Sequence, residues 1–198
     1  MEKAHFLIRK YKSTDEIEWL RCRVLAFLNT AYFDDVIQEK SSYRNRSIEL
    51  VAELEGKIVG LIDVECEKEP GAVCSSDRQL SGMIWHTAVH PDFQREGIGA
   101  ALLAEAEKSA KQEGMQRLEA WTRDDSSVNE WYRRMGFDLR ASYFHVYMEK
   151  NEIKREFQGV FGDFTPIQLF SHYQGNERRG IKKRFKRVHE CRCYEKRI

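Results

Sequence analysis

Apolar residues recur at every second position in two neighbouring stretches of the chain. The runs cover residues 47–54 and 57–64, and the dipeptide Glu55-Gly56 separates them. A period of two is typical of a half-buried strand, and a short turn containing glycine joins antiparallel neighbours. The pattern therefore predicts a β-hairpin.

A strand followed by a helix is predicted next. Residues 82–89 are apolar and partly β-branched, and Pro91 ends the run because proline cannot donate to a ladder. From Ile98 to Ala110 apolar residues recur at every fourth position, and Gly114 follows. This spacing puts the apolar side chains on one face of a helix, which we expect to pack on a sheet.

The same two periods predict the remaining elements. Further strands are expected at residues 6–9, 117–122, 143–148 and 187–194. Helices are expected at residues 17–28, 128–135 and 152–157, and a loop at residues 67–79. Because 198 residues are enough for one domain with a sizeable core, we predict a single domain over residues 5–198.

Composition excludes several classes of protein. The formal net charge is +1, with 41% hydrophobic and 33% charged residues, so no polyanionic partner is demanded. The first residues are unlike a secretory signal, and no apolar run approaches the ~20 residues of a membrane helix. We expect a cytoplasmic protein without a membrane partner, whose five cysteines are reduced.

A metal site is considered and rejected at the end of the chain. His189, Cys191 and Cys193 alternate along one predicted strand. Three side chains on one face of a strand cannot surround a metal tetrahedrally without a fourth ligand from elsewhere. We therefore interpret them as packing residues and predict no metal.

Two glycines, Gly97 and Gly99, stand where the central strand gives way to the helix. Glycine lets backbone N–H groups turn toward a ligand, and a helix N-terminus attracts anions. A ligand that carries phosphate is one interpretation, and a tight strand-to-helix turn with nothing bound is the other.

The motif Gln94-x-x-Gly97-x-Gly99 after an apolar strand resembles the acetyl-coenzyme A loop of the GNAT family of N-acetyltransferases. A second motif of that family is similar to Tyr132-Arg133-Arg134-Met135-Gly136-Phe137. The resemblance implies acetyl-coenzyme A as cosubstrate, held by the backbone of Ala88 and Val89. It also implies contacts from the loop residues Gln94, Arg95, Glu96, Gly97, Ile98, Gly99 and Ala100.

The resemblance also implies a fold. It is an α/β (α+β) fold, with a mixed, mostly antiparallel twisted sheet flanked by helices and a V-shaped split between the two central strands. Residues 6–150 follow the family pattern, and residues 187–197 supply a final strand. Residues 151–186 form an insertion that the pattern does not explain.

Tyr132 is the predicted general acid. A phenol is protonated at neutral pH and can protonate a departing thiolate, and by resemblance this tyrosine lies beside the coenzyme sulfur. The alternative is a core aromatic residue beside Trp131. Asp125 aligns with a family position that is often Asn and contacts the pantetheine, although a helix N-cap is the other role open to it.

The general base is left open among several residues. A histidine such as His86 can titrate near neutral pH, but strand alternation points it away from the face of Val89, which we expect to carry Met83, Trp85 and Thr87. A structural histidine is the alternative. Glu65 is a second candidate base, and three further routes are open: Asp63, Glu119 and a chain of water molecules.

We predict acetyl transfer to a primary amine of a small molecule or a peptide. Acidic residues near the first helix, including Asp34 and Asp35, suit a cationic acceptor. An acyl group longer than acetyl, or a hydroxyl acceptor, keeps the same fold. A homodimer is possible through an exposed final strand.

A binding module without catalysis is the rival hypothesis. The coenzyme site would then act as a sensor, and the basic residues between 178 and 187 would hold nucleic acid or a protein. A solvated basic face is the preferred interpretation of that cluster, so nucleic acid is not an expected partner.

Overall fold

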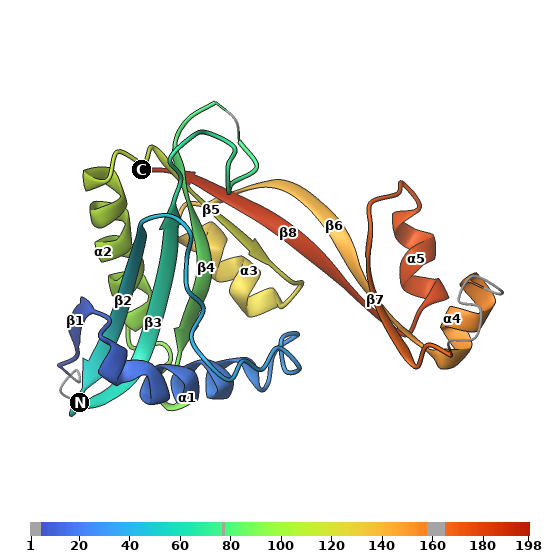
Figure 1. Cartoon of the computed structure of the whole chain (residues 1–198), viewed down its shortest axis with the longest axis horizontal. Helices are drawn as coiled ribbons and strands as arrows, with labels where there is room; N and C mark the ends of the chain where they lie inside the picture. The colour runs from blue at the N-terminus through green and yellow to red at the C-terminus, as the bar shows by residue number, and fades with distance from the viewer. Residues whose placement is uncertain (1–4, 77, 158–164) are drawn as a thin grey trace.

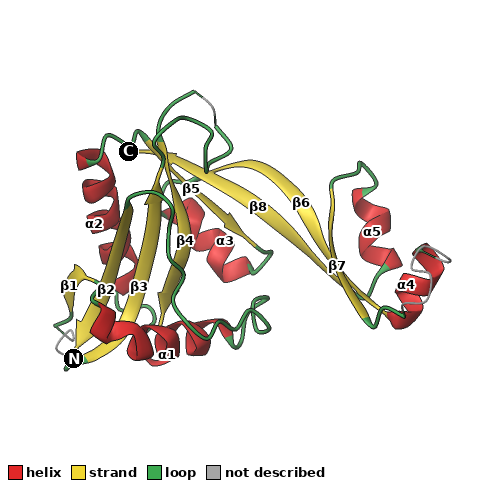
Figure 2. Cartoon of the chain, viewed as in Figure 1, coloured by secondary structure: helices red, strands yellow, loops and turns green. Residues whose placement is uncertain are grey.

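Within the described residues, eight strands form one sheet with helices on both faces (Figures 1 and 2). The computed structural model describes residues 5–76, 78–157 and 165–198; residues 77 and 158–164, within the predicted loop and insertion, lie outside them. In spatial order the strands are β1 (Leu7–Lys10), β2 (Ser47–Leu54), β3 (Lys57–Cys66), β4 (Ser81–Val89), β5 (Arg117–Thr122), β8 (Arg187–Arg197), β6 (Asp138–Glu149) and β7 (Gln168–Tyr173). The helices are α1 (Glu16–Phe27), α2 (Ile98–Gln112), α3 (Ser126–Arg134), α4 (Lys150–Glu156) and α5 (Arg178–Arg184).

β4 and β5 are the parallel pair in this sheet, and all other described pairings are antiparallel. Their pairing covers Ser81 to Ile84 of β4 and then stops, although β4 continues to Val89 and β5 to Thr122. The two strands therefore diverge, and the predicted mixed sheet with a split is confirmed.

A β-bulge marks the point where the strands part. Ile84 pairs with Val64 of β3, but the next pair is His86 with Asp63, so Trp85 has no partner on β3. An inserted residue bends its strand and increases the local twist. The bulge thus explains why β4 diverges from β5 directly after Ile84.

Each face of the sheet has its own hydrophobic core. α2 packs its buried residues, such as Ile98 and Leu102, on the face that carries Ile62 and Val64 of β3, and we call this the α2 face. α1 covers the opposite face, the α1 face, where Trp19 is fully buried. Burying such a side chain is worth about 3–5 kcal/mol against alanine.

β6 and β8 form a long ribbon that extends away from the rest of the molecule (Figure 1). α4, β7 and α5 lie at its far end, and we call these three elements with the adjoining ribbon the arm lobe. The lobe has its own apolar cluster, which includes Phe144, Ile153, Ile181 and Phe185. The described part of the insertion is therefore a separately packed extension of the sheet.

Three sequence expectations need correction here. β6 begins at Asp138, earlier than the predicted residue 143, and the strand β7 and the helix α5 were not predicted. The final strand β8 lies between β5 and β6, so it is not exposed at an edge. The edge strands are β1 and β7, and the argument for a dimer through the final strand is wrong.

Candidate active site

The loop between β4 and α2 adopts the geometry of an anion-binding turn. Arg95 has φ 65° and Gly97 has φ 88°, both in the left-handed region, directly before α2 begins at Ile98. Left-handed residues interspersed in a turn gather consecutive N–H groups into a concave nest, and the first amides of a helix have no intrahelical partner. This loop can hold a phosphate group.

The loop residues differ in what they can offer a ligand. Gln94, Arg95, Glu96 and Gly97 are exposed, and Gln94 Nε2 donates to the Val89 carbonyl at 3.1 Å. Ile98 is buried in the core, so only its backbone can face a ligand. Ala100 is exposed in the first turn of α2.

Gly99 has room beside it. A β-carbon there would lie 3.6 Å from Val89 and 3.6 Å from Trp131, which is ordinary contact. The packing of the protein alone therefore does not require glycine at this position. A ligand that approaches the backbone closely would.

The edge of β4 that faces the split exposes selected peptide groups. The His90 amide donates to the Val59 carbonyl at 2.9 Å, so His90 points its backbone toward β3. Because peptide groups alternate along a strand, those of Val89 and Thr87 point into the split, whereas that of Ala88 points to β3. Of the two backbone positions expected to contact the coenzyme, Val89 has the free amide.

Tyr132 of α3 lies on the α2 face of the split, within the larger core. Its ring stacks on Tyr194 at 5.4 Å and meets the edges of Trp131 and Phe137. Burial raises the pKa of the Tyr132 phenol above its usual value, and nearby Thr87 moderates that pKa. The phenol is therefore protonated throughout the physiological range.

Thr87 is a polar group that the sequence analysis left without a role. It pairs with Ile62, so its side chain shares the α2 face with Tyr132. Its Oγ1 is buried beside the Tyr132 hydroxyl, whose pKa it lowers, and forms no other hydrogen bond among the described residues. Because a hydroxyl oxygen has two acceptor lone pairs, this oxygen can also contact a group bound in the split.

Asp125 occupies the N-cap position of α3, but its side chain makes no capping bond. Both carboxylate oxygens instead accept from the Ala31 amide at 3.1 Å. Asp125 therefore ties the loop after α1 to the start of α3. Its predicted contact with the pantetheine stays a prediction.

His86 lies on the α1 face, opposite Val89, as strand alternation predicted. Trp19 meets its ring edge-on at 5.3 Å, and Arg23 Nε donates to His86 Nδ1 at 3.4 Å. Burial, followed by the charges of Arg23 and Lys40, lowers the pKa of His86 to about 3. Such an imidazole is a weak base at neutral pH.

The bulge changes the predicted content of the Val89 face. Thr87 lies on that face, but Met83 pairs with Glu65 on the α1 face and Trp85 bonds to the same carboxylate. The expectation that Met83 and Trp85 share the face of Val89 is wrong, because an unpaired residue shifts the alternation by one position.

The depressed pKa of His86 predicts a pH-dependent stability. The unfolded chain binds this proton near pH ~6.5 and the folded chain near pH 3, so lowering the pH across that window favours unfolding. We expect His86→Gln to reduce the fall in unfolding free energy between about pH 7.5 and about pH 5.5. Urea titrations at both pH values measure it. The exposed His5→Gln is the control and keeps the wild-type fall; an unchanged fall in His86→Gln would contradict the assignment.

The three candidate carboxylates are all buried on the α1 face. Glu65 accepts from the Asn45 amide, the Asn45 side chain and Trp85 Nε1 at 2.9–3.1 Å. Glu119 accepts from Ser75 and from Trp121 Nε1 at 2.8–2.9 Å. Asp63 pairs with Lys40 at 2.8 Å and with the Tyr43 hydroxyl, while its Oδ1 has no partner among the described residues.

Two tryptophans at the split were not assigned a functional role from the sequence. Trp85 and Trp121 directly follow the last paired residues of β4 and β5, so they flank the split on the α1 face. Each indole N–H is fixed on a buried carboxylate, and Trp85 is 50% exposed. Glu119 and Trp121 lie two residues apart on one strand, which is a local signal of their contact, whereas Glu65 and Trp85 lie on different strands and give no such signal.

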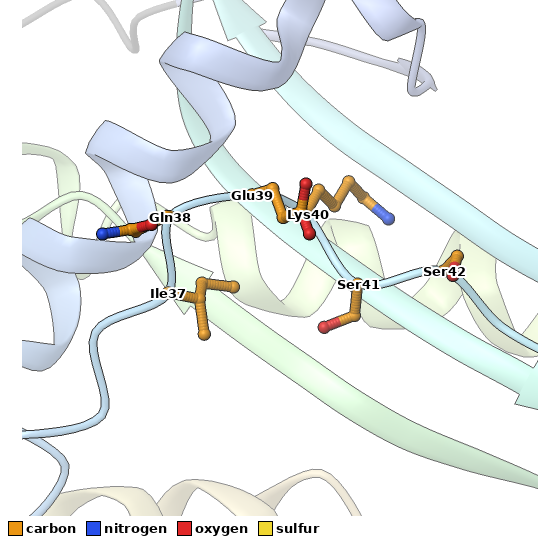
Figure 3. A pocket seen from close by; sticks show the side chains of 6 residues that line it. All are labelled: Ile37, Gln38, Glu39, Lys40, Ser41 and Ser42. Atoms are coloured by element: carbon orange, nitrogen blue, oxygen red, sulfur yellow. The ribbon is translucent and has the colours of Figure 1, made fainter.

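An open hollow lies beside the loop of residues 37–42 (Figure 3). Lys40 belongs to its lining, but its ammonium group turns inward to Asp63 and Glu49. The hollow therefore offers no free cation from Lys40. We assign it no part in the site.

Three observations on the part of the chain that the structure describes bear on other classes of site. There, no group of three or more histidine, cysteine or acidic side chains is arranged to hold a metal ion. Among the same residues, no helix has the length and apolarity needed to cross a bilayer. The basic residues of α5 pair in part with acids, for example Arg178 with Glu190, Lys182 with Asp124 and Arg184 with Glu156.

Comparison with protein families gives a match that covers the strands β2 to β5 and the glycine loop. A family model described as an acetyltransferase (GNAT) domain matches residues 45–139. Over 89 residues, the chain is 32% identical to an uncharacterized N-acetyltransferase of Methanocaldococcus jannaschii. That alignment covers 44% of this chain, and the chain spans only 38% of the relative's length.

Solved structures resemble the whole fold. An acetyltransferase of the GNAT family from Streptococcus pneumoniae superimposes with a TM-score of 0.61 at 18% identity, covering 98% of this chain and 100% of that one. A GNAT family acetyltransferase from Elizabethkingia anophelis with acetyl-CoA bound gives 0.54 at 16% identity, covering 98% of both chains. At these identities the likeness concerns the fold.

Proposed function

Because the chain belongs to the GNAT family of acetyltransferases, we propose that it transfers an acetyl group from acetyl-coenzyme A directly to a primary amine. The observation that carries the proposal is the split between β4 and β5, with an anion-binding nest at one end and Tyr132 on its wall. The matched residues 45–139 contain all of these parts, whereas α1, which covers the opposite face of β4, lies outside them.

The coenzyme would lie along the split. The nest around Arg95 and Gly97 suits its pyrophosphate, and the free amide of Val89 suits the pantetheine arm or the thioester carbonyl. The acetyl-coenzyme A complex of the Elizabethkingia relative supports this donor.

The two faces of the split divide the chemistry. The amine approaches from the α1 face, between Trp85 and Trp121, and its lone pair forms the new C–N bond. The C–S bond then breaks, Tyr132 on the α2 face gives its proton to the leaving thiolate, and the proton that the new amide nitrogen releases restores the phenol by way of solvent. No covalent enzyme intermediate is needed, because both substrates are held together.

The acceptor ammonium must lose a proton before it attacks. Glu65 lies under the exposed ring of Trp85 and is the carboxylate that we propose as the proton acceptor. His86 is a poorer candidate because its pKa is about 3. Asp63 is held by Lys40, so its negative charge is already compensated.

Release of free thiol from acetyl-coenzyme A tests the proposal. The purified protein is incubated with a panel of linear polyamines, aminoglycosides, amino acids and peptides with free N-termini or lysines. We expect one class of amine to accelerate thiol release above the acceptor-free rate. Release at the blank rate with every amine and with hydroxyl analogues would contradict amine acetylation.

A further inference from the structure

A row of aromatic rings leads from the split onto the arm lobe. Trp121 of β5 lies 5.3 Å from Tyr143 of β6, which lies 4.7 Å from His172 of β7. His172 in turn lies 5.3 Å from Phe170. We call these four residues the aromatic track.

The far end of the track is open to solvent although a core lies directly behind it. Phe170 is 49% exposed and His172 is exposed, whereas Leu169 and Tyr173 on the same strand turn to the apolar cluster of the lobe. Strand alternation thus presents aromatic side chains on both faces of β7. An exposed aromatic surface held on a rigid strand is typical of a binding site.

The track rings pack on other aromatic rings, among them His145, which stacks on His172 at 4.9 Å. On the same sheet face, Arg187 lies 3.8 Å over Tyr147 and Arg123 lies 4.3 Å over Tyr32. Among the described residues, no arginine or lysine lies over any of the four track rings. The protein uses cation–π contacts beside the track and leaves the track itself to other partners.

The electrostatic balance at the split end of the track is negative. Glu119 under Trp121 and Glu65 under Trp85 are buried and form no ion pair with a described residue. Nearer the lobe, Arg187 and Arg123 share the single carboxylate of Asp34, which offsets part of their charge. At the split end a positively charged ligand is therefore favoured over a polyanion.

We propose that the aromatic track holds the distal part of an elongated acceptor with two or more ammonium groups, such as a linear polyamine. The reacting amine then reaches the split between Trp85 and Trp121, while a second ammonium group lies over the track rings. This inference rests on the proposed amine acetylation. It assigns a role to β7, which lies outside the matched residues 45–139.

The test compares a long and a short acceptor in the full chain. We expect the double substitution Phe170→Ala with His172→Ala to raise the KM for a linear polyamine about tenfold, because the cation–π contact of the exposed Phe170 ring and the adjoining contact surface of His172 are lost. The kcat/KM for a monoamine with the same reacting end stays at the wild-type value. Ile167→Ala, at a 74% exposed position of the same lobe, is the matched control and changes neither value.

The possible outcomes distinguish a binding role of the aromatic track from a structural role. Equal losses for both acceptors would indicate a structural role of the lobe and overturn the proposal, as would unchanged kinetics in the double variant. Calorimetric titration of the polyamine into the wild type and the double variant measures the affinity of the track for the polyamine in the absence of turnover. If the wild type binds the polyamine but transfers no acetyl group, and the variant does not bind it, the proposed function fails while the track stands. Track-dependent retention of single-stranded RNA, without polyamine binding, would assign the track to nucleic acid instead.

Discussion

Tyr132→Phe is expected to lower kcat about 100-fold or more and to leave the affinity for acetyl-coenzyme A unchanged, since general acid catalysis contributes about 10²–10⁴-fold. Phenylalanine keeps the ring stack on Tyr194 and the edge contacts with Trp131 and Phe137. Only the proton donor is lost. Steady-state kinetics and coenzyme titration measure the two quantities separately.

Tyr194→Phe is the matched control for this substitution. It changes the ring that stacks on Tyr132 and removes the hydrogen bond from the Tyr194 hydroxyl to Asn129 Oδ1 at 2.9 Å. We expect a loss of stability of about 1 kcal/mol and a kcat near that of the wild type. A Tyr132→Phe protein that turns over like the wild type would exclude the tyrosine as general acid.

The raised pKa of Tyr132 also determines how kcat depends on pH at alkaline values. Because burial raises the pKa, the acid form persists to higher pH than in a free phenol. Loss of the Tyr132 proton therefore cannot reduce kcat below about pH 10.

Gly97→Ala is expected to weaken coenzyme binding about tenfold. An L-residue held at φ 88° costs about 1–2 kcal/mol, so we expect the free loop to relax away from the nest geometry. Binding of a phosphate must then restore the strained geometry, and the affinity falls by that cost. Titration with coenzyme A, with unfolding by urea alongside, separates affinity from stability.

Gly56 provides a control because its backbone has the same left-handed conformation. It has φ 78° in the turn between β2 and β3, and a β-carbon there would meet nothing within 4 Å. We expect Gly56→Ala to cost a similar amount of stability and to leave coenzyme affinity unchanged. Equal affinities for coenzyme in all three proteins would contradict the nest.

The sequence predicts the sheet core well because its strands alternate clearly. The hairpin of residues 47–54 and 57–64 and the strand at residues 82–89 appear where the period of two indicated them. The glycine loop also lies at the start of the helix, as its motif indicated. These features depend on residues close together in the chain.

The arm lobe was harder to predict for a physical reason. In β7 the outward residues Phe170 and His172 are aromatic, so the strand lacks the alternation of apolar and polar side chains. In α5 a single buried residue, Ile181, stands among basic residues and beside Gly180, which leaves no helical period to detect. Tertiary packing on the long ribbon decides both elements.

The bulge at Trp85 illustrates a second limit. It arises from the register between β3 and β4, which no local pattern records. For this reason the sequence assigned Met83 and Trp85 to the wrong face. The pairing of β4 with β5 places Trp85 and Trp121 on opposite sides of the split, so the proposed acceptor entrance became apparent only from strand pairing.

The proposed acid and the proposed acceptor lie on opposite faces of the split, so the acetyl group can pass directly from the thioester to the amine. The measurement that tests it most directly is the mass of both acceptor and protein in reactions quenched during turnover with the active amine from the thiol-release panel. We predict one acetylated acceptor for each thiol released and an unmodified protein at every time point. An acetylated protein that passes its acetyl group to the acceptor, or thiol release without an acetylated amine, would contradict the account.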